Sequence, residues 1–130
     1  KRVESIDENQ TILLSSIFQY TDSKDWNIID GHFCLLDANG QVTKIPEEIF
    51  MKMNPLAILT IFDEVEVICQ RLHNRDSFNH NPDLMSLFQD EEIEYSQHIA
   101  RLLNIPYLAC KLDEAMNSGI KFVKELMSGD

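Results

Sequence analysis

The feature that most constrains the fold of this chain is a set of three apolar runs that alternate with helical patterns. The apolar runs cover residues 26–33, 56–62 and 106–112. Unbroken apolar runs of this length are typical of strands that are covered on both faces of a sheet. Strands that alternate with helices at this spacing predict βαβ units with right-handed crossovers. We therefore expect an α/β fold with a mainly parallel sheet between helical layers.

Helical patterns and turn signals fill the intervals between these runs. Helices are expected over residues 7–20, from Pro46 onward, from about 63 to 74, over about 84–103 and from 113 to about 127. The stretch Asp37-Ala38-Asn39-Gly40 predicts a tight turn, because Asn and Gly tolerate a positive φ. Residues 74–82 are rich in turn formers and charged residues, which favours a mobile, lid-like loop.

Length and composition indicate one domain, spanning residues 1–130. A chain of 130 residues with 44% hydrophobic content can bury a sizeable core but leaves little room for a second domain. Its formal net charge of −11 repels a nucleic-acid backbone, and its 11 Lys and Arg residues form no basic stripe. We therefore expect no DNA or RNA partner.

The sequence also indicates a cytoplasmic protein without a membrane span. No apolar run reaches the length of a membrane helix, and the polar start over residues 1–10 cannot be the apolar core of a signal peptide. Cys34, Cys69 and Cys110 are odd in number and far apart, which favours reduced core thiols over disulfides or a zinc site. The five methionines are dispersed, which predicts gap-filling core residues; they are Met51, Met53, Met85, Met116 and Met127.

Asp30 is a candidate ligand for Mg²⁺. It lies near the end of the first apolar run, and the carboxyl ends of parallel strands line the ligand crevice of an open α/β sheet. A carboxylate there can hold Mg²⁺ directly or through water. An Asp at a strand end also starts turns or caps a following helix, so both interpretations stay open.

Several short motifs along the chain resemble one family. They are Ile28-Ile29-Asp30-Gly31-His32, Asn39-Gly40, Ile45-Pro46, Asn54-Pro55-Leu56-Ala57-Ile58-Leu59, Ile68-Cys69-Gln70-Arg71-Leu72, Asn74-Arg75-Asp76, and the spacing of Gln97 and Arg101. In this order they resemble the archaeal-type adenylate kinases and related small P-loop ATP-binding proteins of nucleotide kinase type. The resemblance implies a P-loop NTPase fold of the nucleoside monophosphate kinase type.

This family begins with a strand and a glycine-rich phosphate loop, and none of the four glycines here stands in such a loop. We therefore expect the chain to be the C-terminal part of a kinase-like domain that lacks its N-terminal Walker A segment. In the complete parent, the resemblance implies ATP and Mg²⁺ as cofactors, with indirect metal binding by Asp30. His32 and Gln97 are then cofactor-binding residues, although a hydrogen-bonded histidine at a strand end is an equally good interpretation of His32.

Three arginines are the catalytic candidates that the resemblance implies. Phosphoryl transfer needs cations on the transferring group, and lid arginines supply them. Arg71 would stack on the ATP base, Arg75 would reach phosphate from the lid, and Arg101 would meet the transferring group from the long helix. The alternative is three surface arginines in an acidic protein.

The leading functional hypothesis is phosphotransfer from ATP to a nucleoside monophosphate or similar acceptor in the complete parent, with this chain alone inactive. A second hypothesis is a non-catalytic interaction or oligomerisation domain on a degenerate kinase scaffold. A third is an ATPase or sensor that uses the nucleotide as a switch. Exposed edges of a thin sheet also predict a homodimer formed by strand pairing.

Overall fold

The computed structural model describes residues 2–3, 6–22 and 24–129, which form two compact units. Unit 1 covers residues 1–55 and unit 2 covers residues 56–130. The structure confirms a mixed α/β protein, but with two small sheets instead of one. One sheet has the strand order β1-β2-β3 and the other pairs β4 with β5.

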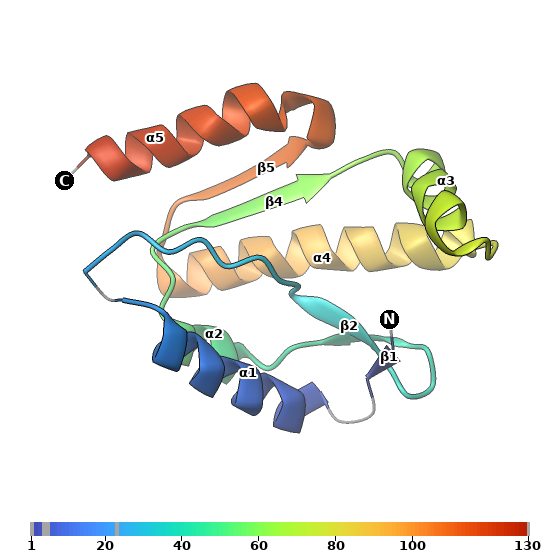
Figure 1. Ribbon diagram of the computed structural model, residues 1–130, viewed down its shortest axis with the longest axis horizontal. Coiled ribbons are helices and arrows are strands. Elements are labelled where there is room, and N and C mark those ends of the chain that lie inside the picture. Colours follow the sequence, from blue (N-terminus) through green and yellow to red (C-terminus); the bar gives the residue numbers. More distant parts are fainter. Residues whose placement is uncertain (1, 4–5, 23, 130) are drawn as a thin grey trace. The chain divides into compact units, whose positions relative to one another are not determined.

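Unit 1 combines helices with a small mixed sheet (Figure 1). Its elements are β1 (Arg2–Val3), α1 (Ile6–Tyr20), β2 (Cys34–Asp37), β3 (Val42–Lys44) and α2 (Glu47–Met53). Strand β2 pairs in parallel with β1 and antiparallel with β3. Cys34, Ile45 and Phe50 are among the buried residues, and Phe50 stacks on Phe33 with the ring centroids 4.7 Å apart.

The predicted first strand over residues 26–33 is wrong. These residues belong to no strand, and Ile28 is 88% exposed. The strand forms later, because the predicted turn closes a local hairpin between β2 and β3. Gly40 donates to the Asp37 carbonyl at φ 74°, and the Asp37 carboxylate accepts from two further backbone amides. A hairpin closed over a few residues costs less loop entropy than a long-range parallel pairing.

Unit 2 contains the parallel pair that the sequence predicted. Its elements are β4 (Ile58–Phe62), α3 (Val65–Asp76), α4 (Pro82–Leu103), β5 (Tyr107–Lys111), a 3₁₀ turn (Leu112–Glu114), a π-helical turn (Ala115–Gly119) and α5 (Ile120–Ser128). Strands β4 and β5 pair in parallel from Ile58 opposite Tyr107 to Phe62 opposite Lys111. Parallel neighbours need a long crossover, which α3 and α4 supply here.

Helices α4 and α5 cover opposite faces of the β4–β5 pair (Figure 1). On one face, Tyr95, Ser96, Ile99 and Ala100 of α4 are buried. On the other face, a Cβ placed on buried Gly119 would lie 3.6 Å from the Leu59 side chain. A methyl group at this position would make an ordinary van der Waals contact with Leu59, so the start of α5 packs directly on the sheet.

Both ends of α4 are capped by residues whose capping preference is visible in the sequence. Asn81 caps α4 by accepting from the backbone amides of Asp83 and Leu84, and Pro82 occupies the first helical position. Asn104 ends the helix in the left-handed conformation at φ 55°. These caps fix the length of α4 and hence where β5 begins.

The prediction of core thiols is confirmed for Cys34 and Cys110, whereas Cys69 is only half-buried. All three cysteines are free, and Cys34 and Cys110 are buried. Burial raises the pKa of the Cys110 thiol, with a smaller contribution from Glu114. The prediction that the methionines fill the core is wrong for Met51, Met116 and Met127, which are all more than half exposed.

A buried hydroxyl cluster joins α4 to both strands. Ser96 is fully buried, its Oγ accepts from Thr60 Oγ1 at 3.0 Å, and it lies 2.8 Å from the Tyr107 hydroxyl. Ser96 also donates to the Ile93 carbonyl within its own helix. One hydroxyl thus bonds to β4, β5 and α4 at once.

We expect Ser96→Ala to destabilise unit 2 by about 1–3 kcal/mol, because the Thr60 and Tyr107 hydroxyls lose a buried partner. Urea unfolding followed by far-UV circular dichroism measures this loss. Ser118→Ala, at an exposed position of the same unit, is the matched control and should change the stability by less than about 0.5 kcal/mol. Equal effects of the two substitutions would contradict the role of the cluster.

Candidate functional site

The strongest candidate site in unit 2 lies at the carboxyl ends of β4 and β5. This edge of a parallel sheet is where open α/β proteins bind ligands. Asp63 and Glu64 follow β4 directly, and Lys111 is the last residue of β5. Arg71 reaches the same edge from α3.

Asp63 is fixed by three neighbours at this edge. The side-chain amide of Gln89 on α4 accepts from the Asp63 backbone N–H at 3.1 Å and donates to the Asp63 carbonyl at 2.8 Å. The Asp63 carboxylate accepts from the Glu64 backbone amide and lies 3.1 Å from Arg71 Nη1. The Asp63 side chain is only 14% exposed; Gln89 of α4 holds its backbone, and Arg71 of α3 holds its carboxylate.

Lys111 and Glu64 form a second ion pair across the same edge. Lys111 Nζ donates to Glu64 Oε1 at 2.8 Å. This hydrogen bond, together with the attraction of the same carboxylate, raises the pKa of Lys111. Both cations at the edge, Arg71 and Lys111, are therefore already neutralised by acids of this chain.

The lid-like segment predicted over residues 74–82 is partly helical. Helix α3 continues to Asp76, a loop covers residues 77–81, and α4 begins at Pro82. Within it, Asp76 accepts from the Phe78 backbone amide and pairs with His80 at 3.0 Å. The Phe78 hydrogen bond, helped by His80 and Arg75, lowers the pKa of Asp76. This carboxylate ties the loop to the end of α3.

The three candidate arginines do not converge on one point. Arg71 and Arg75 lie one turn apart on α3, and Arg75 Nη2 is 3.7 Å from Asp76. Arg101 lies on α4, more than three turns beyond Gln89, which is about 18 Å along the helix axis. Gln89 contacts Asp63, which pairs with Arg71, so these three residues lie at the carboxyl end of β4. Arg101 therefore lies toward the opposite end of the sheet.

Gln97 and Arg101 share a small hollow at that opposite end. Its volume is about 250 Å³, and Tyr107 is also among its lining residues. The structure thus brings Gln97 and Arg101 together as the sequence spacing indicated. It does not bring them to the carboxyl edge of the strands, where ligands of α/β sheets usually bind.

Asp30 and His32 lie in unit 1, in the extended segment that precedes β2. Both are exposed, and Asp30 does not stand at the end of a parallel strand as expected. Within the part of the chain that the structure describes, no cluster of three or more His, Cys, Asp or Glu residues is arranged to hold a metal ion. Indirect Mg²⁺ binding by Asp30 stays a prediction.

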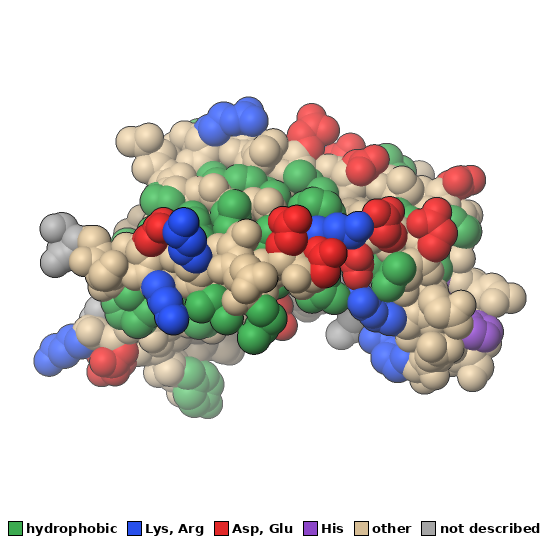
Figure 2. All heavy atoms as spheres, turned by 90° about the horizontal axis from the view of Figure 1, so that it is seen from above, with side chains coloured by type: hydrophobic (Ala, Val, Ile, Leu, Met, Phe, Trp, Pro, Cys, Tyr) green, Lys and Arg blue, Asp and Glu red, His purple; other side chains and the backbone are tan. Residues whose placement is uncertain are grey.

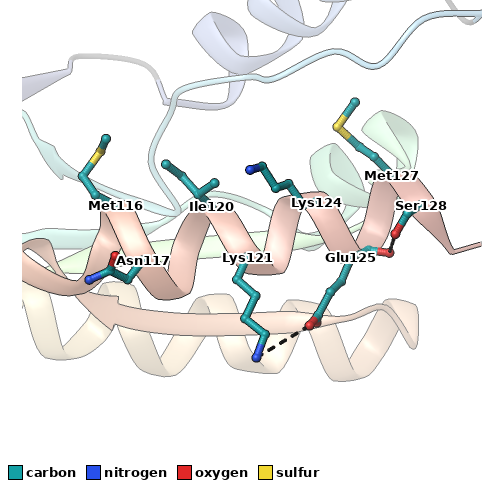
Figure 3. Close-up of a pocket in the computed structure, with 8 residues that line it drawn as sticks. All are labelled: Met116, Asn117, Ile120, Lys121, Lys124, Glu125, Met127 and Ser128. Atoms are coloured by element: carbon teal, nitrogen blue, oxygen red, sulfur yellow. Dashed lines mark hydrogen bonds and ion pairs between the residues drawn. The ribbon is translucent and has the colours of Figure 1, made fainter.

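A second candidate surface, which the sequence analysis missed, lies on α5. An open hollow of about 770 Å³ follows this helix and is lined by Met116, Asn117, Ile120, Lys121, Lys124, Glu125, Met127 and Ser128 (Figure 3). The signal that could have found it is the spacing of Met116, Ile120 and Met127, which places three apolar residues on one helical face. In the view from above, hydrophobic, basic and acidic side chains are interspersed over the visible face (Figure 2).

Comparison with known proteins adds no family to these observations. No protein-family model, curated protein or solved structure significantly matches this chain. The resemblance to nucleotide kinases therefore rests on the short motifs alone. In the described residues, no helix combines the length and the apolar character needed to cross a membrane.

We expect Glu64→Gln to lower the pKa of Lys111 toward its ordinary value, because the variant loses the charged acceptor. A carbon-detected NMR titration of the lysine side chains measures this directly. The pair stabilises the fold below the unfolded lysine pKa, about 10.4, and this contribution is lost as the pH rises through the raised pKa of the folded state. Glu66→Gln is the control and should leave Lys111 unchanged. An identical pKa in wild type and Glu64→Gln would contradict the pairing.

Proposed function

We propose that this chain is a non-catalytic interaction domain, which acts by binding another protein surface. The observation that carries the proposal is the exposed apolar face of α5. Met116 is 74% exposed and Met127 is 53% exposed, and both lie beside lysines on the same helix. Apolar patches with a charged rim are typical of protein-binding surfaces. Methionine suits such surfaces because its side chain adapts to different partners.

The charges at the carboxyl edge of the sheet support the same proposal. A phosphate site needs cations that are available to the ligand. Here Arg71 pairs with Asp63, Lys111 with Glu64, and Arg75 with Asp76. A nucleotide would have to displace acids of this chain from each of these cations. The residues described therefore fit the phosphates of ATP poorly, and we derive no transfer step through them.

Phosphotransfer with ATP and Mg²⁺ in a P-loop kinase-like parent is the second candidate. The observation that favours it is the position of Arg71 and Asp63, just beyond the carboxyl end of β4. Open α/β folds keep their ligands at this edge. Arg101 and Arg71 lie too far apart to contact the same transferring phosphoryl group, which argues against this candidate.

Calorimetric titration tests whether this chain alone binds a nucleotide. With Mg-ATP, and separately with AMP, we expect no saturable heat at ligand concentrations up to about 1 mM, which corresponds to less than about 4 kcal/mol of binding free energy. Arg71→Ala should behave like the wild type.

Saturable binding of Mg-ATP would contradict the interaction-domain proposal. Loss of that binding in Arg71→Ala would support the phosphotransfer candidate, provided that Lys52→Ala still binds. Lys52 is the control because it lies at an exposed position of α2.

A further inference from the structure

Helix α5 carries apolar residues on two sides. On the side toward the sheet, Gly119 is buried and shares a helical face with Phe122 and Leu126, which are half-buried. On the outer side, Met116, Ile120 and Met127 are exposed. A surface helix normally presents one apolar stripe and one polar face. The exposed apolar residues lie roughly a quarter turn around the helix from those that face the sheet, so the apolar surface of α5 extends beyond the part that the sheet covers.

The outer face consists of two rows of side chains (Figure 3). In one row, Met116, Ile120 and Met127 point the same way together with Lys124. In the other row, Lys121 and Glu125 lie one turn apart, with Lys121 Nζ 3.9 Å from Glu125 Oε1. The hollow of about 770 Å³ is lined by residues of both rows.

We propose that this outer face binds the same face of a second copy of the chain, with the two α5 helices antiparallel. In a two-fold contact, residue i of one copy meets residue j of the other, and j meets i. If the two-fold axis passes near Val123, each Lys121 faces Glu125 of the second copy. The same rotation places each Ile120 between Lys124 and Met127 of the other helix.

Charge complementarity is the reason to choose a second copy as the occupant. Lys121 and Glu125 carry opposite charges four residues apart, so an antiparallel copy matches them twice. The chain as a whole carries −11, whereas the charged residues lining this face are two lysines and one glutamate. Contact through this face therefore causes little repulsion between the negative charges of the two copies. Lys124 lies near the axis, and its long stem lets the ammonium group stay in water.

The size of the face sets the expected strength of the contact. Residues 116–128 extend over about 20 Å of helix. Two such helices alone bury less than the roughly 1,200 Å² of a stable interface, so the dimer is weak and concentration-dependent. This inference rests on the proposed interaction function and names its partner.

Sedimentation equilibrium of charge-swapped chains tests the contact. The wild type should show reversible self-association. Lys121→Glu and Glu125→Lys should each weaken it about tenfold, because each variant opposes like charges at two symmetry-related places. An equimolar mixture of these two variants should recover the association, and so should the double swap, Lys121→Glu with Glu125→Lys.

The mixture is the decisive sample. Each single variant places like charges four residues apart in its own α5, which costs some helix stability. Both chains of the mixture keep that defect, so recovery on mixing reports only the pairing between copies. Met116→Gln tests the apolar row and should weaken the association without loss of helix content by circular dichroism. Lys52→Glu, at an exposed position of α2, is the control for net charge and should associate like the wild type.

Three results would overturn the proposal. They are a wild type that stays monomeric up to about 1 mM, single swaps that associate like the wild type, and a mixture that fails to recover. The second result would assign the self-association to another surface, such as the edges of β4 and β5. These failures are distinguishable from failure of the proposed function, which depends on the separate titration with Mg-ATP.

Discussion

The parallel pairing of β4 with β5 is the constraint on which the rest of unit 2 depends. Parallel neighbours cannot be joined by a tight turn, so α3 and α4 must carry the chain back to the start of β5. A sheet of two strands must also be covered on both faces to keep its apolar side chains from water. Helix α4 covers one face and binds both strands through the Ser96 hydroxyl, and the close approach at Gly119 brings α5 onto the other. The outer side of α5 then remains exposed.

This arrangement places charged residues at the edge where open α/β sheets bind ligands and yet offers little for phosphate chemistry. The carboxyl edge of β4 and β5 gathers Asp63, Arg71 and Lys111, as the edge of an open α/β sheet is expected to do. Each cation there is neutralised by an acid from the same unit, and Arg101, another candidate arginine, lies at the far end of α4. The exposed surface of α5 carries apolar residues beside charged ones, which suits protein contact better than catalysis.

The sequence predicted the local turns and caps and the pairing of β4 with β5, but not the position of the first long strand. The two runs that became β4 and β5 are mainly apolar and are each adjacent to strong helical patterns, so their pairing followed from the βαβ rule. The run over residues 26–33 looked the same by composition, but the Asp37 to Gly40 turn next to it closes a hairpin that places the strand at Cys34–Asp37. The motif spacing placed Arg71 at the sheet edge and Gln97 beside Arg101. It could not show that Arg101 lies more than three turns of α4 beyond Gln89, the residue that contacts Asp63, because the sequence does not show which part of α4 packs beside the end of β4. Exposure of Met116 and Met127 was also hidden, since composition alone does not tell a covered methionine from an uncovered one.

The most direct test of the central claim, that the outer face of α5 is the binding surface of this chain, is a dilution series followed by amide NMR shifts. Spectra recorded between about 1 mM and about 10 μM cover the range expected for a contact of this size. The account predicts concentration-dependent shifts that are concentrated in residues 116–128, with the amides of β4 and α2 unchanged. Shifts confined to the edges of β4 and β5, or none over the whole range, would contradict it.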